Sequence, residues 1–488
     1  MHEVLYSTPF TLECLSPIHV GSGEKLGGLD FVREGGHVVV LDQRKMAAVI
    51  EARHLEDAYV RLCESGRPDV QEFLRTSRVP PREVAAYILR ITGSVGREIL
   101  PFIKTPDGRV YMPGSSVKGA IRSALLHRIV EERADVRQAI ATEAIRNLGR
   151  LRRPAVGRMS AKLRGASDLA DQSAFGKDHN RNVMRILHLV DTRSIPPGQL
   201  SAAEVRVLTV RDGKLEVKET QSRMPMRLTA EILPAGTRLG AEFTRNAYLE
   251  DSQGPARALG LGDRVEFVAA WVAHCNAMAQ AALQREADFA RRFGHTALAG
   301  RYEAMLQQVA GLGAQQCILH LGWGAGYDAM ALGNLFDPES RRRIRIGANL
   351  GKIDRGEPVE PFPKSRKVVW GGDGSSIDPL GWILLTLGER LGKVEVQEQV
   401  LSAQVQPAAQ LQPAEEAQRP AQRSAPEGRQ AWGRDRELKP RDVAKIEALR
   451  RSLEKDSSPD AKKKTTSKAS EKAKREQEQI NKKFRGEE

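Results

Sequence analysis

The sequence predicts an α+β fold of the ferredoxin-like kind, because short strands and helices alternate and strands return after a long helical region. Residues 10–14 alternate apolar and polar side chains, as a half-buried strand does, and residues 30–42 have the pattern of a strand, a Gly-Gly turn and a second strand. Residues 184–192 are strand-like again, whereas residues 263–309 are rich in Ala, Arg and Glu and predict helix. From about residue 398 the composition changes to Pro, Ala and Gln and then to Lys, Glu and Ser, which predicts a disordered, charged C-terminal tail.

The composition narrows the possible partners and sites. Over 488 residues, 76 Lys and Arg stand against 62 Asp and Glu, a formal net charge of +14. This favours a polyanionic partner: nucleic acid, an anionic membrane surface or an acidic protein. The four cysteines, Cys14, Cys63, Cys275 and Cys317, form no C-x-x-C pair and have no zinc-finger spacing, so no metal site is expected. Scattered cysteines suit a reducing cytoplasm, and no apolar run of about 18 residues predicts a membrane span.

A possible anion site lies in PGSSVKGAIR, at residues 113–122. A Pro-Gly turn and two serines, Ser115 and Ser116, precede a helix, where free N–H groups and the helix dipole attract phosphate. Lys118 and Arg122 are four residues apart and share a helix face, so both can reach a nucleic-acid backbone. The alternative is a serine N-cap followed by a solvated basic face.

Two glycine-containing stretches could approach a nucleic acid closely. In SPIHVGSGEK, Ser22, Gly23 and Lys25 can form an anion nest, although a tight loop between strands explains them equally well. In HLGWGAGY, Trp323 could stack on a base while Gly324 lets the strand approach, although a core tryptophan in a turn is the alternative. Neither stretch has the spacing of a Walker A or Rossmann motif, so no cofactor is expected.

The combination and order of these stretches resemble a known family. They are SPIHVGSGEKL, PGSSVKGAIRSALLH, FGKDHNRNVMRILHLVDT, LGWGAGY and the closing PLGW. Across residues 8–390 the sequence resembles the RAMP superfamily of CRISPR-associated proteins, and more narrowly the fifth subunit of the type III-A Csm effector complex.

The resemblance implies a fold and a set of partners. It implies two fused ferredoxin-like (RRM-like) RAMP domains with helical insertions, at residues 1–240 and 241–397, followed by the tail at residues 398–488. Apart from the resemblance, residues 145–182 are basic, irregular and low in large apolar side chains, which predicts a mobile insertion or a loop that its partner orders. The partners would be crRNA, the other Csm subunits including the adjacent backbone RAMP subunit, host nucleases that trim the crRNA 3′ end and, indirectly, target RNA.

The resemblance also implies a role without catalysis. The subunit would cap the crRNA 3′ end, end the backbone filament and support 3′-end maturation without cutting RNA. The residues that it implies for RNA contact are Ser22, Gly23, Lys25, Ser115, Ser116, Lys118, Arg122, Trp323 and Gly324. The alternative is a RAMP ribonuclease that processes crRNA through His19 or His320, or cleaves target RNA through Asp30.

Overall fold

The computed structural model describes residues 5–66, 68–149, 159–251, 254–371 and 376–391, and these residues form one compact unit. Their strands form two main sheets and one small hairpin, β11 (Ile353–Asp354) with β12 (Glu357–Pro358). Among the described helices, none is long and apolar enough to cross a membrane. The expected tail at residues 398–488 lies outside the described residues.

The first sheet is antiparallel throughout and joins the two ends of the described chain. Its order is β10 (Gln316–His320), β15 (Trp382–Leu387), β1 (Leu5–Cys14), β9 (Arg238–Asn246) and β5 (Leu187–Leu189). Phe10, Leu12 and Cys14 of β1 are almost fully buried, so the apolar positions of the predicted strand lie in the core, although Thr11 on the other face is buried as well. Each such apolar side chain contributes about 1.5 to 3 kcal/mol to folding.

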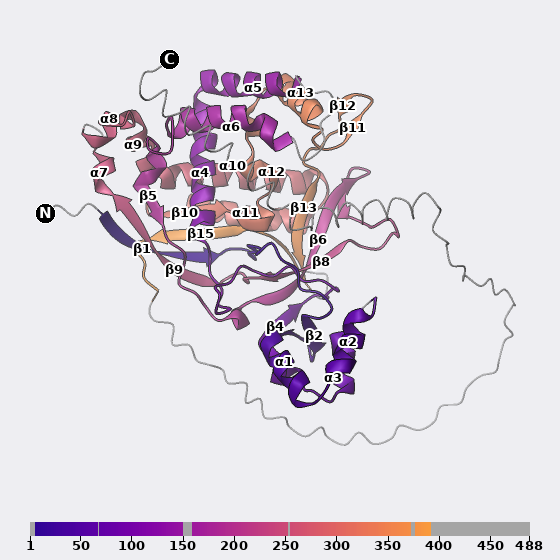
Figure 1. Ribbon diagram of the computed structural model, residues 1–488. Coiled ribbons are helices and arrows are strands. Elements are labelled where there is room, and N and C mark those ends of the chain that lie inside the picture. The colour runs from indigo at the N-terminus through magenta and orange to yellow at the C-terminus, as the bar shows by residue number, and fades with distance from the viewer. Residues whose placement is uncertain (1–4, 67, 150–158, 252–253, 372–375, 392–488) are drawn as a thin grey trace, which may run out of the picture. The chain divides into compact units, whose positions relative to one another are not determined.

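The first sheet has the ferredoxin-like arrangement. In chain order, β1, helix α4 (Gly114–Glu132), β5, β9, helix α10 (Trp271–Arg292) and β15 give a β-α-β-β-α-β pattern interrupted by insertions. Figure 1 shows α4, α10 and α11 (Thr296–Ala310) on one side of this sheet. The helices predicted over residues 263–309 are therefore confirmed, as α9 (Gly262–Ala269), α10 and α11.

The second sheet is mixed. Its order is β14 (Ile377–Pro379), β13 (Ser365–Trp370), β6 (Ser201–Arg211), β4 (Ala85–Thr92), β3 (His37–Leu41) and β2 (Phe31–Glu34), with β7 (Lys214–Val217) and β8 (Arg227–Ile232) also paired to β6. β4 and β6 are parallel, and the other pairs are antiparallel. Each sheet takes strands from both sides of residue 240, so the residues expected as two domains share both sheets. A second ferredoxin-like domain stays a prediction.

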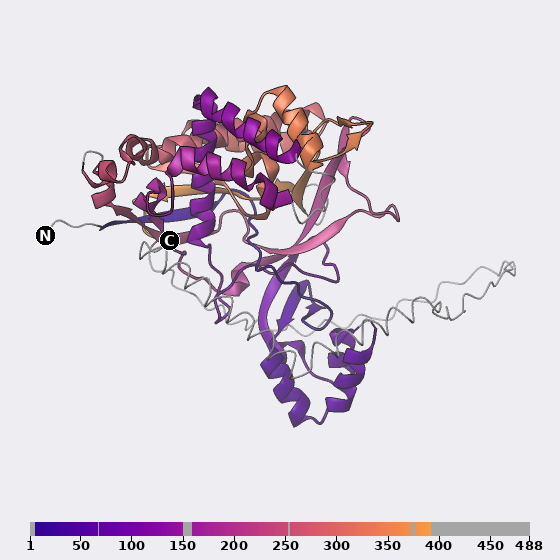
Figure 2. The ribbon, with the colours of Figure 1, turned by 45° about the horizontal axis from the view of Figure 1, so that its top comes forward.

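Two helical groups complete the unit. Figure 2 shows the indigo helices α1 (Gln43–Ala52), α2 (Glu56–Glu64) and α3 (Val70–Thr76) beside β2 and β3, with which they share a small core. Short helices α7 (Ala247–Glu250), α8 (Pro255–Ala258) and α12 (Gly326–Met330) lie in the connections between longer elements.

The apolar stripe predicted for α4 is confirmed at Val117, Ile121, Ala124 and Leu125, all buried.

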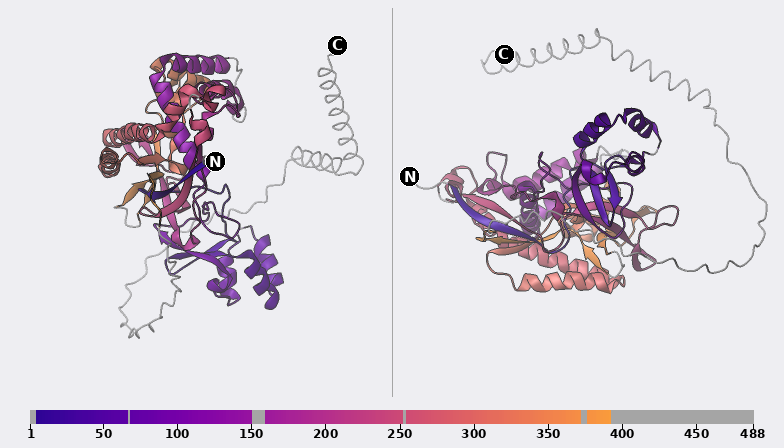
Figure 3. Two further views of the ribbon diagram at one scale, coloured as in Figure 1. Left: turned by 90° about the vertical axis from the view of Figure 1, so that its left-hand side faces the viewer. Right: turned by 90° about the horizontal axis from the view of Figure 1, so that it is seen from below.

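The prediction of an irregular insertion at residues 145–182 is wrong for most of that stretch. Helix α5 (Ala134–Gly149) extends into it and α6 (Met159–Phe175) follows, and both pack with α13 (Pro338–Ala348). Figure 3 shows these purple and orange helices lying together. On α6 the buried members of this core are the small side chains Ala166 and Ala170. A search for large apolar residues therefore underestimates the buried face of that helix.

Candidate functional site

Three segments that are far apart in the sequence meet at one place. The backbone N–H of Gly381 donates to the carbonyl of Pro17 (2.9 Å), and that of Leu321 donates to Gly381 (2.8 Å). The N–H of Trp323 donates to the carbonyl of His19 (2.9 Å). The three glycine-containing motifs singled out in the sequence, SPIHVGSGEK, LGWGAGY and PLGW, therefore form one structure, which we call the glycine junction (residues 17–25, 321–326 and 379–382).

Two glycines make this close approach possible. A Cβ atom added at Gly324 would lie 2.2 Å from the carbonyl oxygen of Leu380. Gly322 has a φ of +75°, and its added Cβ atom would lie 2.5 Å from the carbonyl oxygen of His19. Other residues would force the segments apart. These glycines thus bring the loop segments together, a role separate from any contact with a ligand.

A buried polar cluster anchors the junction, and the sequence analysis missed it. Glu231 on β8 is fully buried, and its carboxylate accepts hydrogen bonds from the Tyr87 hydroxyl (2.6 Å) and the Phe102 N–H (2.7 Å). It also pairs with the Lys104 ammonium, which is 13% exposed. The His19 ring donates through Nδ1 to the carbonyl of Glu231 (2.7 Å). No local motif marks this cluster, because its members are separated by up to 212 positions.

Both candidate catalytic histidines hydrogen-bond to the backbone of the protein, His19 in a buried position and His320 in a partly buried one. His19 is buried against the ring edges of Phe102 and Trp323, and burial lowers its pKa. His320 donates through Nε2 to the carbonyl of Leu380 (3.0 Å) and stacks on Trp382, with ring centroids 4.0 Å apart. Burial lowers the pKa of His320 to about 4. Each ring therefore supports the junction in its neutral form at pH 7.

Asp30 ends a turn. Its side-chain Oδ2 accepts from the N–H of Gly27 (2.7 Å), and strand β2 begins at the next residue, Phe31. Gln43 donates to the other carboxylate oxygen at 3.5 Å. The contacts of Asp30 are those of a residue that closes a turn.

The outer side of the glycine junction is exposed and carries two lysines, Lys25 and Lys367, as well as the exposed carboxylate of Glu24. Ser22, Gly23 and Lys25 are exposed, and Lys25 pairs with Glu98 (2.8 Å). Trp323 is partly exposed, and the Lys367 ammonium lies 5.1 Å from the centre of its ring.

Lys367, on β13, is a further basic residue that the sequence analysis did not single out. It is partly buried, has no acidic partner among the residues described, and burial lowers its pKa. An isolated, partly desolvated ammonium of this kind can be neutralised by a phosphate. Because Lys367 lies within an ordinary strand pattern, sequence reasoning had no signal for it.

At the start of α4, neither serine caps the helix, contrary to the N-cap alternative. The N-cap residue is Pro113, which offers no side-chain hydrogen bond. Instead, the carboxylate of Asp191 accepts from the N–H of Gly114 (2.9 Å). Ser115 is exposed and Ser116 is partly exposed. A negative charge from the protein itself thus sits at the positive end of the helix.

The two cations of α4 already contact the protein. The Lys118 ammonium donates to the carbonyl of Leu187 (2.6 Å), and burial lowers its pKa. Arg122 pairs with Asp171 on α6 and lies 5.0 Å from the centre of the Phe175 ring. Of these two cations, only Lys118 has no acidic partner among the described residues, so its charge is available to an anion.

Part of the chain matches the model of a known protein family. Residues 11–250 match the model of the RAMP superfamily. A 132-residue stretch is 30% identical to the CRISPR system Cms protein Csm5 of Streptococcus thermophilus, covering 24% of this chain and 37% of that protein. The protein of the same name from Mycobacterium tuberculosis is 33% identical over 154 residues, 26% of this chain and 41% of its own length. The matched stretches thus span less than half of these relatives.

Solved structures extend the likeness in fold. The crystal structure of T. onnurineus Csm5 has a TM-score of 0.52 and 22% identity, covering 76% of this chain and 99% of that one. A chain in the cryo-EM structure of a Csm-crRNA-target RNA ternary complex of a type III-A CRISPR-Cas system has a TM-score of 0.56 and 22% identity, covering 78% and 100%. At this identity the likeness concerns the fold alone.

Proposed function

This chain belongs to the RAMP superfamily, and on that premise we propose that it is a non-catalytic, crRNA-binding subunit of a cytoplasmic type III-A Csm complex. In this proposal it caps the crRNA 3′ end, terminates the backbone filament and supports 3′-end maturation. Its partners are crRNA, the adjacent backbone subunit and, for trimming, host nucleases. The two Csm5 relatives and the shared fold support the proposal.

The observation that carries the proposal is the outer side of the glycine junction, where Lys367 lies beside the partly exposed ring of Trp323. Lys25 and Lys367 present ammonium groups there, and Lys367 has no acidic partner among the described residues. Trp323 adds a partly exposed ring that can stack on a base. Contacts with phosphate and with any base face do not read sequence, which suits a subunit that must accept any spacer.

The contacts of the candidate catalytic residues favour the non-catalytic role. His19 and His320 each donate to a backbone carbonyl inside the protein, and Asp30 accepts from a turn N–H. A general base needs a free atom near the 2′-hydroxyl that it deprotonates. Each of the three groups thus already has a hydrogen-bond partner within the protein.

RNA binding can be tested with charge-matched variants. In Lys25→Ala with Lys367→Ala, the slope of log affinity against log salt should fall by about 0.7 to 1.4 for single-stranded RNA, with Lys367 contributing more because Lys25 already pairs with Glu98. The control is Lys214→Ala with Lys218→Ala, two exposed lysines at the two ends of β7, which should leave the slope unchanged. Fluorescence anisotropy at several salt concentrations measures both. Equal slopes for the two double variants would contradict the proposed surface.

The cellular role is tested by isolating the tagged protein with its bound molecules. We expect the other Csm subunits and crRNAs with trimmed 3′ ends. If instead the pure protein shortens repeat-containing RNA, and if His19→Ala, His320→Ala or Asp30→Ala abolishes this, the ribonuclease alternative is correct.

A further inference from the structure

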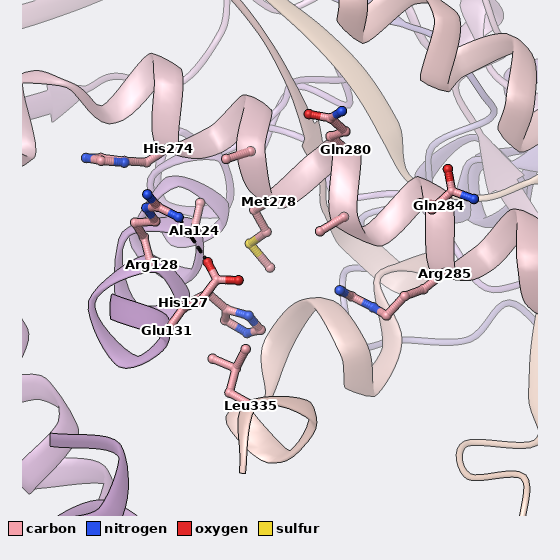
Figure 4. A pocket seen from close by; sticks show the side chains of 12 residues that line it. Ala124, His127, Arg128, Glu131, His274, Met278, Gln280, Gln284, Arg285 and Leu335 are labelled. Atoms are coloured by element: carbon pink, nitrogen blue, oxygen red, sulfur yellow. Dashed lines mark hydrogen bonds and ion pairs between the residues drawn. The ribbon is translucent and has the colours of Figure 1, made fainter. Parts of the chain in front are cut away.

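A second site lies between α4 and α10, and no residue of the glycine junction lines it. It is a hollow of about 380 Å³ whose walls come from both helices and from Leu335 (Figure 4). Ala124, Met278 and Leu335 give it an apolar part. This volume is in the range of pockets that hold small molecules.

The hollow contains a buried hydrogen-bond acceptor that has no partner. His127 is 8% exposed, and its Nε2 has no hydrogen-bond partner. The ring also interacts with the backbone of Ala331. Because the N–H of Ala331 already donates to Tyr327 (2.8 Å), we assign the ring proton to Nδ1, on the side of the Ala331 carbonyl. Nε2 is therefore a bare acceptor, and leaving such a group unsatisfied costs about 1 to 3 kcal/mol.

A free cation faces the same hollow. Arg285 is exposed, and no acidic partner for it exists among the described residues. Figure 4 shows the Arg285 and His127 side chains pointing toward one another below Met278. The positive charge of Arg285 is close enough to help lower the pKa of His127, after burial, which is the main cause.

The other charged groups of the hollow are already satisfied within the protein. Arg128 pairs with Glu131 (3.2 Å) and with Glu132 (2.6 Å). The amide N–H₂ of Gln284 donates to Asp288 (3.0 Å). The unmet requirements among the described residues are therefore a hydrogen-bond partner for His127 Nε2, one for His274 Nε2, which also lines the hollow, and an anion for Arg285.

We propose that this hollow, the His127 pocket, binds a nucleotide, with a base N–H or ribose O–H donating to His127 Nε2 and the phosphate pairing with Arg285. One small ligand then supplies both the donor and the anion, and its base or sugar covers the apolar part. A guanidinium suits phosphate because it can donate two parallel hydrogen bonds. The ligand is either a free mononucleotide or one nucleotide of an RNA strand, which share this chemistry. The site is separate from the glycine junction and does not depend on the proposed role there.

The test is calorimetric titration of the full chain with 5′-AMP, 5′-UMP and inorganic phosphate. We expect the mononucleotides to bind, inorganic phosphate to bind more weakly, and Arg285→Ala to lose about tenfold or more in affinity. Arg292→Ala is the control, because Arg292 is exposed on the same helix outside the pocket and should bind like wild type. His127→Phe keeps an aromatic ring without the acceptor and should also weaken binding. Since Arg285 is exposed, its variant tests the pocket even if His127→Phe does not fold.

Further titrations distinguish a free mononucleotide from a nucleotide of an RNA strand, and the His127 pocket from the glycine junction. A short single-stranded RNA is titrated into the Lys25→Ala, Lys367→Ala protein, so that the glycine junction contributes less. If 5′-AMP competes with this RNA and Arg285→Ala weakens both, the pocket takes a nucleotide of a strand; if only the mononucleotide binds there, it takes free nucleotide. No mononucleotide binding by wild type, binding unchanged in Arg285→Ala, or inorganic phosphate binding as tightly as 5′-AMP overturns the proposal.

Discussion

Replacing Glu231 by Gln removes the buried negative charge that organises the underside of the glycine junction. In the wild-type protein the Glu231 carboxylate satisfies the Tyr87 hydroxyl, the Phe102 N–H and the Lys104 ammonium together. A carboxamide keeps the shape but has one oxygen and one N–H₂ group. The N–H₂ group must then face at least one of these donors, and Lys104 loses its counter-charge.

The size of the effect follows from burial. Glu231 is 0% exposed and Lys104 is 13% exposed, so water cannot replace the lost partner. Breaking a buried ion pair by removing one member costs about 3 to 5 kcal/mol. Against a typical unfolding free energy of about 5 to 15 kcal/mol, Glu231→Gln should be strongly destabilised.

Urea unfolding followed by tryptophan fluorescence measures this change. The matched control is Glu98→Gln, which breaks the Lys25–Glu98 pair, whose side chains are 62% and 63% exposed. That change should cost about 1 kcal/mol or less. If the two variants lose the same stability, or if Glu231→Gln loses less than about 1 kcal/mol, the argument that the buried cluster anchors the junction is refuted.

Three further results are expected. Gly324→Ala should lose stability in thermal unfolding, because its Cβ atom would lie 2.2 Å from the carbonyl oxygen of Leu380; a wild-type melting temperature would show that the segments can separate freely. Lys118→Ala with Arg122→Ala should weaken RNA binding and reduce its salt dependence, measured by filter binding. Most of the change should come from Lys118, because Arg122 already has an acidic partner; equal effects of the two single variants would contradict this. The pKa of His320 is about 4 in the folded protein against 6.5 in the unfolded chain, so the unfolded chain binds more protons between these values. The contribution of His320 to stability should therefore be fully present above pH 6.5 and be lost as the pH falls from about 6.5 to about 4. His320→Phe should reduce this pH dependence, which unfolding curves of both proteins at pH 7 and pH 5 measure.

Local sequence signals account for much of the fold and for the loops of the site. The alternation in β1, the turn between β2 and β3 and the apolar stripe of α4 each depend on neighbouring residues, so they could be predicted. The division of strands between two sheets could not, because β1 pairs with strands more than 220 positions later.

The contacts inside the site were predictable only in part. The glycine motifs could be recognised one by one, but their meeting depends on hydrogen bonds between residues about 300 positions apart, such as Trp323 and His19. The Glu231 cluster and Lys367 carry no local pattern at all. For the same reason the helix α6, which supplies Asp171 to Arg122, was predicted as an irregular stretch.

The pairing of β1 with β15 has a consequence for how the chain is made. Translation proceeds at about 5 to 20 residues per second, so β1 leaves the ribosome about 20 to 75 s before β15 can join it. β1 can pair with β9 on one edge only once β9 has been synthesised, and its other edge has no native neighbour until β15 follows. Exposed strand edges promote association between chains, so nascent chains on the same mRNA are more prone to aggregate than the finished protein. A chaperone that covers residues 10–14 until β15 is synthesised would increase the yield of folded protein.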